Sequence, residues 1–102
     1  MVSYKFTKEA ILDLSEIWNY TIETWSEKQA DKYYGLIINE CNLLAKSPEL
    51  GRSYFEVYPG LFGQKIAKHI IFYRRLDHST IEIARILHEI RDLNNELNPT
   101  KQ

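Results

Sequence analysis

The sequence has very few of the residues that mark secreted or membrane-embedded proteins. It contains one cysteine, Cys41, so no intramolecular disulfide is available, which fits a reducing compartment. No apolar run approaches the roughly 20 residues of a membrane-spanning helix. Lys5, Lys8 and Glu9 interrupt the amino terminus too early for a secretory signal. We therefore expect a soluble cytoplasmic protein with no membrane partner.

Signatures of common catalytic sites are also missing. His69, His78 and His88 do not have metal-ligand spacing with one another or with Cys41. Cys41 falls on an apolar stripe with helical spacing, which favours a buried structural thiol over a nucleophile. The chain has no glycine-rich phosphate loop, no repeat and no low-complexity segment. We predict neither a bound metal nor a cofactor.

Charge is unevenly distributed although the formal net charge is only −1. Residues 1–59 carry six Lys or Arg and nine Asp or Glu, a balance of −3, whereas residues 60–91 carry six and three, a balance of +3. The basic second part permits an acidic partner. The excess is too small for a dedicated nucleic-acid-binding protein, so specific DNA binding is not expected.

The first half of the chain predicts a strand followed by two helices. Residues 2–6 alternate as a strand does, and Thr7 and Ser26 each stand where a helix N-cap is expected. The first apolar stripe, from Ala10 to Trp25, recurs every three or four residues and leaves Glu9, Asp13, Glu16 and Glu23 on the far side. The second stripe runs to Ala45, and Ser47-Pro48 ends it. Gly35 interrupts that helix, and we expect it to allow close approach of the first helix.

The second half predicts strands. Residues 61–66 form one strand, and residues 69–88 form a hairpin around the turn Asp77-His78-Ser79. Strict alternation would put Ile81, Ile83, Arg85 and Leu87 on one face, opposite Glu82, Ala84, Ile86 and His88. The predicted fold is therefore α+β, in the order β-α-α-β-β-β, with a helical hairpin packed on one face of a small, mainly antiparallel sheet. One domain spans residues 1–97, including a short helix over 89–97, and residues 98–102 form a flexible tail.

Several segments together resemble a known family. They are T-K-E-A-I-L-D-L from Thr7, W-S-E-K-Q-A-D-K-Y-Y from Trp25, L-A-K-S-P-E-L-G-R from Leu44, I-I-F-Y-R-R from Ile70 and I-E-I-A-R-I-L-H-E-I-R-D from Ile81. In this order and spacing they resemble the ParE branch of the RelE/ParE toxins of type II toxin–antitoxin systems. The resemblance implies the RelE/ParE-like fold and a cytoplasmic toxin, active in growth arrest and plasmid stabilisation, with a ParD-like antitoxin. It also implies DNA gyrase as the target, bound rather than chemically modified.

The residues support two hypotheses about the site. In a gyrase-binding toxin, we expect Tyr73, Arg74, Arg85 and His88 to contact the target, and Trp18, Trp25, Tyr33 and Ile37 to contact the antitoxin. The alternative is a RelE-like ribosome-dependent mRNA endonuclease, with His88 as acid or base and Arg74 and Arg85 stabilising charge. A non-enzymatic toxin is favoured, because this chain is not strongly basic. A third hypothesis, an inactive relative that keeps the fold and only binds antitoxin, is also compatible with the sequence.

Structural roles compete with these functional ones. A lone histidine is weak evidence for catalysis, so His88 is more easily explained as a cap or a packing residue at the end of its strand. Arg85 lies among apolar residues and is expected to pair with an acidic residue, for which the first helix is the candidate location. The aromatic residues Trp18, Trp25, Tyr33 and Tyr34 fit the helical stripes and are expected to fill the space between helices.

Overall fold

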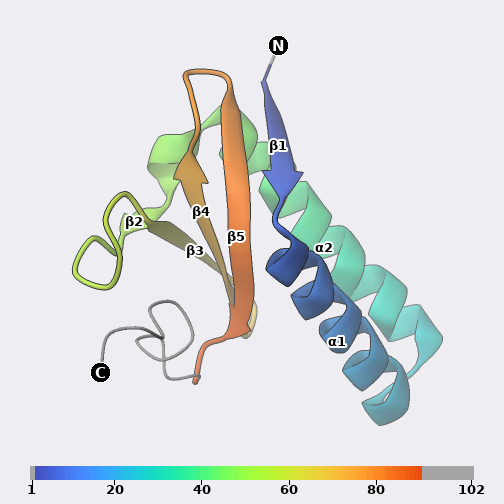
Figure 1. Ribbon diagram of the computed structural model, residues 1–102. Helices are drawn as coiled ribbons and strands as arrows, with labels where there is room; N and C mark the ends of the chain where they lie inside the picture. Colours follow the sequence, from blue (N-terminus) through green and yellow to red (C-terminus); the bar gives the residue numbers. More distant parts are fainter. Residues whose placement is uncertain (1, 91–102) are drawn as a thin grey trace.

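The computed structural model describes residues 2–90 and confirms the α+β architecture (Figure 1). Five strands form one sheet in the order β1-β5-β4-β3-β2. Their bounds are β1 Ser3–Phe6, β2 Arg52–Ser53, β3 Phe62–Ile66, β4 His69–Arg75 and β5 Thr80–His88. β1 runs parallel to β5, and the other neighbouring pairs are antiparallel. The two-residue strand β2 was not predicted.

Helices α1 (Lys8–Thr24) and α2 (Glu27–Lys46) form an antiparallel hairpin over one face of this sheet (Figure 1). The Thr7 hydroxyl accepts a hydrogen bond from the Ala10 amide at 3.0 Å, and the Ser26 hydroxyl accepts one from the Gln29 amide at 3.1 Å. Both predicted N-caps are thus confirmed. α2 ends before Ser47, and a 3₁₀ turn follows over Pro48–Leu50. No helix within residues 2–90 combines the length and apolarity that a membrane span requires.

The main core lies between the helical hairpin and the sheet. The helices contribute mainly small and aliphatic side chains, and the central strands contribute β-branched and aromatic ones: Ala10, Leu14, Ile37, Cys41, Leu44, Ile71, Tyr73, Ile81, Ile83 and Ile86. A smaller cluster on the other face contains Leu61, Ile70, Phe72 and Leu87. The Cys41 thiol is fully buried, which raises its pKa to about 12. Cys41 is therefore a structural thiol, as predicted.

The alternation predicted for β5 is wrong beyond Ala84. Phe72 pairs with Arg85 but Tyr73 pairs with Ile83, so a β-bulge leaves Ala84 without a partner in the register. The extra residue moves Ile86 to the helix-facing core with Ile83, and moves Leu87 to the opposite face. A sequence with apolar residues on both sides of the bulge gives no signal for this shift.

Three predictions for the helices are also wrong. Asp13, assigned to the exposed side of α1, is 7% exposed. The apolar stripe of α1 is wider than the buried face, so Ile11, Ile22 and Trp25 are exposed by 53%, 37% and 71%. A Cβ built on Gly35 meets nothing within 4 Å, so this glycine does not serve close helix packing.

The structure describes only the first two residues of the helix predicted over 89–97. Glu89 and Ile90 form a turn, and the remaining residues lie outside the described range. The boundary between the domain and the tail at residue 97 also lies outside them.

Candidate binding site on the helical hairpin

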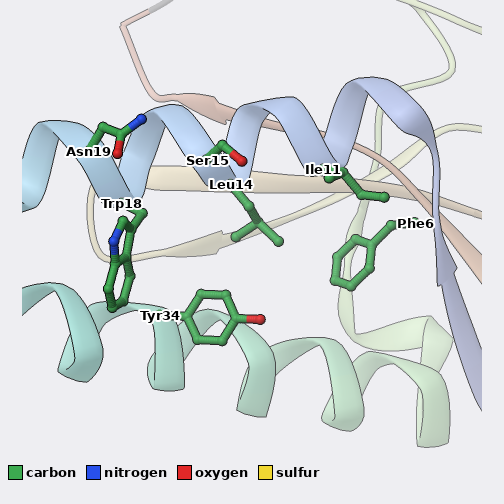
Figure 2. Close-up of a pocket in the computed structure, with 7 residues that line it drawn as sticks. All are labelled: Phe6, Ile11, Leu14, Ser15, Trp18, Asn19 and Tyr34. Atoms are coloured by element: carbon green, nitrogen blue, oxygen red, sulfur yellow. The ribbon is translucent and has the colours of Figure 1, made fainter.

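A groove lies along the outer side of the helical hairpin, where the two helices diverge next to the end of β1. We call it the hairpin groove, and it has a volume of about 390 Å³. Its lining residues come from α1, α2 and β1: Phe6, Ile11, Leu14, Ser15, Trp18, Asn19 and Tyr34. Figure 2 shows Trp18 of α1 and Tyr34 of α2 facing one another across the space between the helices.

The groove exists because α1 carries more apolar side chains than the sheet can cover. Leu14 points inward and is buried, whereas Ile11 and Tyr34 are exposed by 53% and 45%. The Trp18 and Tyr34 rings meet edge to face with centroids 6.1 Å apart, which fixes the width of the groove at its middle. The groove is therefore preformed, with an apolar floor and aromatic walls.

Apolar exposure continues from the groove along α1 towards its carboxyl end. Ile11 and Trp18 are seven residues apart, so they follow one line along the helix. Trp25, the residue that caps the end of α1, comes seven residues later and is 71% exposed. Exposed apolar side chains beside a groove mark a binding surface in a small protein. Its line of anchors at helical spacing suits an amphipathic helix laid along the groove.

The four residues predicted to contact an antitoxin do not share this surface. Trp18 lines the hairpin groove, and Trp25 is exposed at the end of the same line. Ile37 is fully buried in the main core, so it has no exposed surface to offer a partner. Tyr33 is half-buried and turns towards the sheet. Two of the four residues therefore belong to the candidate site.

The residues predicted for a target or catalytic site are spread over the hairpin of β4 and β5. The first of them, Arg85, binds Asp13 of α1 through two hydrogen bonds, Nε to Oδ2 at 2.8 Å and Nη2 to Oδ1 at 3.0 Å. Asp13 Oδ2 also accepts from the Ile86 amide at 3.0 Å. The predicted pairing of Arg85 with an acidic residue of the first helix is thereby confirmed.

The position of Asp13 follows from the short length of β1. The last register pair of β1 and β5 is Phe6 with Ile83, and α1 then begins beside the remaining half of β5. From there Thr7 Oγ1 donates to the Ala84 carbonyl at 2.7 Å, and Asp13 satisfies the Ile86 amide. Side chains thus replace the missing strand partner and satisfy buried backbone groups.

Arg74 and Tyr73 lie near the turn between β4 and β5. Arg74 is 47% exposed and pairs with Glu82, with Nε 2.8 Å from Oε1. Tyr73 is fully buried; its hydroxyl donates to the Pro48 carbonyl at 2.5 Å and accepts from the Gly51 amide at 2.9 Å. These bonds tie the segment after α2 to the central sheet. Tyr73 therefore belongs to the core and has no surface for a target, whereas Arg74 does.

His88 lies at the other end of β5, in a cluster with His69 and Tyr33. The two imidazole rings meet edge to face with centroids 5.2 Å apart, and the Ile90 amide donates to His88 Nδ1 at 3.3 Å. Tyr33 Oη and His69 Nδ1 are 2.6 Å apart, and Tyr33 Oη also accepts from the Lys68 amide at 3.4 Å. The Tyr33 hydroxyl and His69 Nδ1 share one hydrogen bond, whose donor depends on the tautomer of His69.

Burial and, to a smaller extent, the neighbouring His88 together lower the pKa of His69 to about 4. His69 is therefore neutral at physiological pH. The cluster fastens α2 to the end of the sheet by a hydrogen bond between uncharged groups. Its position agrees with the predicted structural role of His88 at a strand end.

The structure does not bring Arg74, Arg85 and His88 together. His88 pairs in register with His69, whereas Arg74 pairs with Glu82. Six residues of strand separate Glu82 from His88, or about 20 Å. Arg85 lies between them but its guanidinium is held by Asp13. The alternative catalytic constellation is therefore not assembled within residues 2–90.

The sequence reasoning missed most of the residues that line the groove. The sequence places Ile11 on the apolar stripe of the first helix and Tyr34 in the space between the helices, and it gives Phe6, Ser15 and Asn19 no role in a site. One usable signal was present. The seven-residue spacing of Ile11, Trp18 and Trp25 adds a second apolar line to α1, beside the buried one through Ala10, Leu14 and Ile17.

Comparison with known proteins agrees with these observations. Residues 4–93 match the family described as the ParE toxin of the type II toxin–antitoxin system parDE. Toxin ParE1 of Mycobacterium tuberculosis is 31% identical over 94 residues, covering 92% of this chain and 96% of that protein. Toxin ParE1 of Caulobacter vibrioides is 28% identical over 89 residues, covering 87% and 91%.

Two solved structures share the fold. The chromosomal ParDE toxin–antitoxin system from P. aeruginosa aligns with a TM-score of 0.73 and 22% identity, over 86% of this chain and 96% of the other. The toxin–antitoxin complex RelBE2 from Mycobacterium tuberculosis aligns with a TM-score of 0.64 and 20% identity, over 86% and 98%. At this level of identity the likeness shows the fold alone.

Proposed function

Since this chain belongs to the ParE toxins of type II toxin–antitoxin systems, we propose that it arrests growth by binding DNA gyrase in the cytoplasm and that a ParD-like antitoxin neutralises it. The proposal treats the protein as a binding module rather than an enzyme. The observation that carries it is the contrast between a preformed apolar groove and a catalytic constellation whose members are held apart.

The hairpin groove supports the antitoxin part of the proposal. It is apolar, open and lined by rigid aromatic rings, which are the features of surfaces that bind an amphipathic segment. Trp18 and Trp25 supply large side chains that lose water when a partner covers them. Trp18, Trp25 and Tyr34 are therefore our candidates for the strongest contacts with an antitoxin.

The gyrase part rests on the family and on the surface left outside the groove. Arg74 is exposed, lies near the turn between β4 and β5 and does not line the groove. A target contact there is compatible with a separate antitoxin contact. Arg85 and His88 remain proposed target residues, although Arg85 already binds Asp13 and only part of its side chain, 22%, is exposed.

The test of the gyrase proposal is the supercoiling of relaxed plasmid by gyrase, titrated with the purified chain. Inhibition by the wild type, weakened by Arg74→Gln and relieved by antitoxin, is the expected result. Glu9→Gln serves as a control, because it changes one exposed charge on α1. Normal supercoiling at saturating, folded and growth-arresting protein contradicts the proposal.

The antitoxin proposal is tested by co-expressing the chain with a ParD-like protein. We expect the two to co-purify, and we expect Trp18→Ala with Trp25→Ala to abolish co-purification while gyrase inhibition survives. Phe55→Ala is a matched control, because Phe55 is an aromatic residue exposed by 52% on the loop between β2 and β3. Unchanged co-purification of the tryptophan double variant contradicts the assignment of the groove.

The mRNA endonuclease alternative makes a different prediction for His88. If His88 were the acid or base, His88→Ala would abolish cleavage of translated mRNA and toxicity while antitoxin binding survived. We expect no cleavage of translated mRNA by the wild type or by His88→Ala, because the arginines that His88 would need are held elsewhere. Cleavage of translated mRNA by the wild type that a folded, antitoxin-binding His88→Ala variant loses would favour the nuclease.

A further inference from the structure

The wall of the hairpin groove formed by α1 is flanked by acidic side chains. Asn19 lines the groove, and Glu16 and Glu23 stand three residues before it and four residues after it. Helical spacing places both carboxylates beside Asn19 on the same side of α1. Both side chains are exposed. The α1 rim of the groove is therefore acidic along two turns.

The opposite wall has the same sign of charge near the tip of the hairpin. Tyr34 lines the groove on α2, and Glu27 and Asp31 precede it by seven and three residues, so they share its side of the helix. Lys28 and Lys32 precede Tyr34 by six and two residues and fall elsewhere on the helix. The charges of this turn are thus segregated, with the acidic ones next to the groove.

This arrangement is unfavourable in the isolated chain. Glu27 and Asp31 are four residues apart, a spacing at which like charges repel. Within residues 2–90, Glu16, Glu23, Glu27 and Asp31 have no basic partner within the 4.0 Å of an ion pair. By contrast, the exposed Glu56 and the half-buried Glu82 each pair with an arginine. A cationic partner in the groove would relieve the repulsion between Glu27 and Asp31 and would supply counter-charges for Glu16 and Glu23.

We propose that the occupant of the hairpin groove is a basic amphipathic helix, with an apolar side that fills the groove and Lys or Arg along the two flanks of that side. The inference rests on the proposed function, because it describes the antitoxin segment that binds there. It adds the chemistry of that segment: the apolar side supplies affinity, and the basic flanks supply recognition and faster association.

The line of exposed apolar anchors on α1, which extends beyond the groove to Trp25, sets the length of this helix. Ile11 and Trp25, the first and last anchors of the exposed line, are fourteen residues apart on α1, a distance of about 21 Å at 1.5 Å per residue. A partner helix of about 14 residues therefore reaches from Ile11 to Trp25. Basic side chains on its flanks then meet Glu16 and Glu23 on one side and Glu27 and Asp31 on the other.

A second copy of this chain fits the groove less well. A two-fold dimer through the groove would place each acidic rim against the same rim of its partner, because an isologous contact joins identical surfaces. A head-to-tail contact would have to use the other side of α2, where Leu36 and Leu43 are exposed by 42% and 51% near Lys32. Such a contact does not close and would form chains of molecules.

The experiment uses the antitoxin that co-purifies with the full chain, separated and rebound to variants at two salt concentrations. We expect association to slow about tenfold between about 0.05 and 0.5 M salt, because screening removes the attraction between rim and flank. We expect Glu16→Gln with Glu23→Gln to weaken binding about threefold to tenfold and to flatten the salt dependence. Glu56→Gln, far from the groove in sequence and paired with Arg52, is the control and should change neither.

A second readout examines the partner itself. The antitoxin fragment that stays bound after limited proteolysis should contain an amphipathic stretch of about 14 residues with a net positive charge. An acidic or neutral protected fragment overturns the inference. Binding that does not depend on salt and is equally tight for the Glu16→Gln, Glu23→Gln double variant overturns it as well. If the free chain forms oligomers and Trp18→Ala disperses them, a second copy of the chain occupies the groove. That result also overturns the inference.

These outcomes separate two kinds of failure. If no antitoxin binds the chain, the proposed function fails and this inference fails with it. If the antitoxin binds and Trp18→Ala with Trp25→Ala removes it, but neither salt nor the charge variants matter, the groove keeps its assigned role and only the basic helix is rejected.

Discussion

The two sides of the helical hairpin carry similar apolar residues but differ in what covers them. On the inner side, Leu14 and Ile37 pack against the sheet and are exposed by 8% and 0%. On the outer side, Trp18 and Tyr34 flank an open groove, and Trp25 is exposed by 71%. The inner side therefore stabilises the fold, whereas the outer side is available to a partner.

Apolar character alone therefore does not distinguish core residues from residues of the binding surface on these helices. Polar contacts separate them better. The inner side is accompanied by Asp13, which binds Arg85 and the Ile86 amide, whereas the acidic residues next to the groove have no such partners within residues 2–90. Substitutions on the two sides should accordingly differ in their effect on the free energy of unfolding.

The largest effect is expected for Asp13→Ala. It removes the carboxylate that binds a largely buried Arg85 and leaves the Ile86 amide without its acceptor. Breaking one partner of a buried ion pair costs about 3 to 5 kcal/mol. Urea denaturation at neutral pH measures the loss. Glu16→Ala, an exposed acidic residue on the same helix, should change stability by less than about 0.5 kcal/mol. Equal losses for the two variants would remove the distinction between the sides.

Ile37→Ala should lower the free energy of unfolding by about 3 kcal/mol, because it leaves a cavity at the centre of the interface between α2 and the sheet. The same urea series measures it. Antitoxin binding by the folded variant should be unchanged, because Ile37 has no exposed surface. A variant that keeps its stability but loses binding would show that Ile37 contacts the partner, as the sequence had suggested.

The third effect concerns pH. The pKa of His69 is about 4 in the folded chain, below its ordinary value near 6.5. Its contribution to stability is therefore complete above pH 6.5 and is lost as pH falls towards 4, because the unfolded chain binds the proton first. Between pH 7 and 5 the loss should be about 1 to 2 kcal/mol. His69→Asn should abolish most of this dependence of the unfolding free energy on pH, which urea denaturation at several pH values measures. An unchanged dependence would mean that other titrating groups cause it.

A smaller gain is expected for Gly35→Ala. Gly35 lies inside α2 where a Cβ meets nothing within 4 Å, so alanine should raise the free energy of unfolding by about 0.5 to 1 kcal/mol. Thermal unfolding measures the gain. Gly63→Ala is the contrasting variant, because its Cβ would lie 2.5 Å from the Tyr54 ring and should destabilise the chain. A destabilising Gly35→Ala would mean that the helix packs more closely there.

The smallest effect on stability is expected for Trp25→Ala, below about 0.5 kcal/mol, because the side chain is largely in water. Its effect on antitoxin affinity should be large by comparison, a loss of about 2 kcal/mol or more if it is a hot spot. Calorimetric titration of the antitoxin gives the affinity, and urea denaturation gives the stability. A destabilised variant with normal affinity would place Trp25 with the inner residues.

Local sequence signals set the order and type of most elements. Thr7 and Ser26 fixed where the helices begin, because their hydroxyls accept the amides of the first turn. Pro48 fixed where α2 ends, and Asp77 fixed the tight turn between β4 and β5 by accepting the Ser79 amide at 2.8 Å. These are local interactions between residues a few positions apart, so a linear pattern contains them.

Which apolar and acidic residues are covered depends instead on long-range packing in the folded chain. The bulge at Ala84 depends on the pairing of β5 with β4, and the burial of Asp13 depends on β1 ending early beside β5. The exposure of Trp25 depends on how far the sheet extends beneath α1. In each case the partner lies distant in sequence, and the periodicity of a helix gives the sides of its surface but not which of them another element will cover.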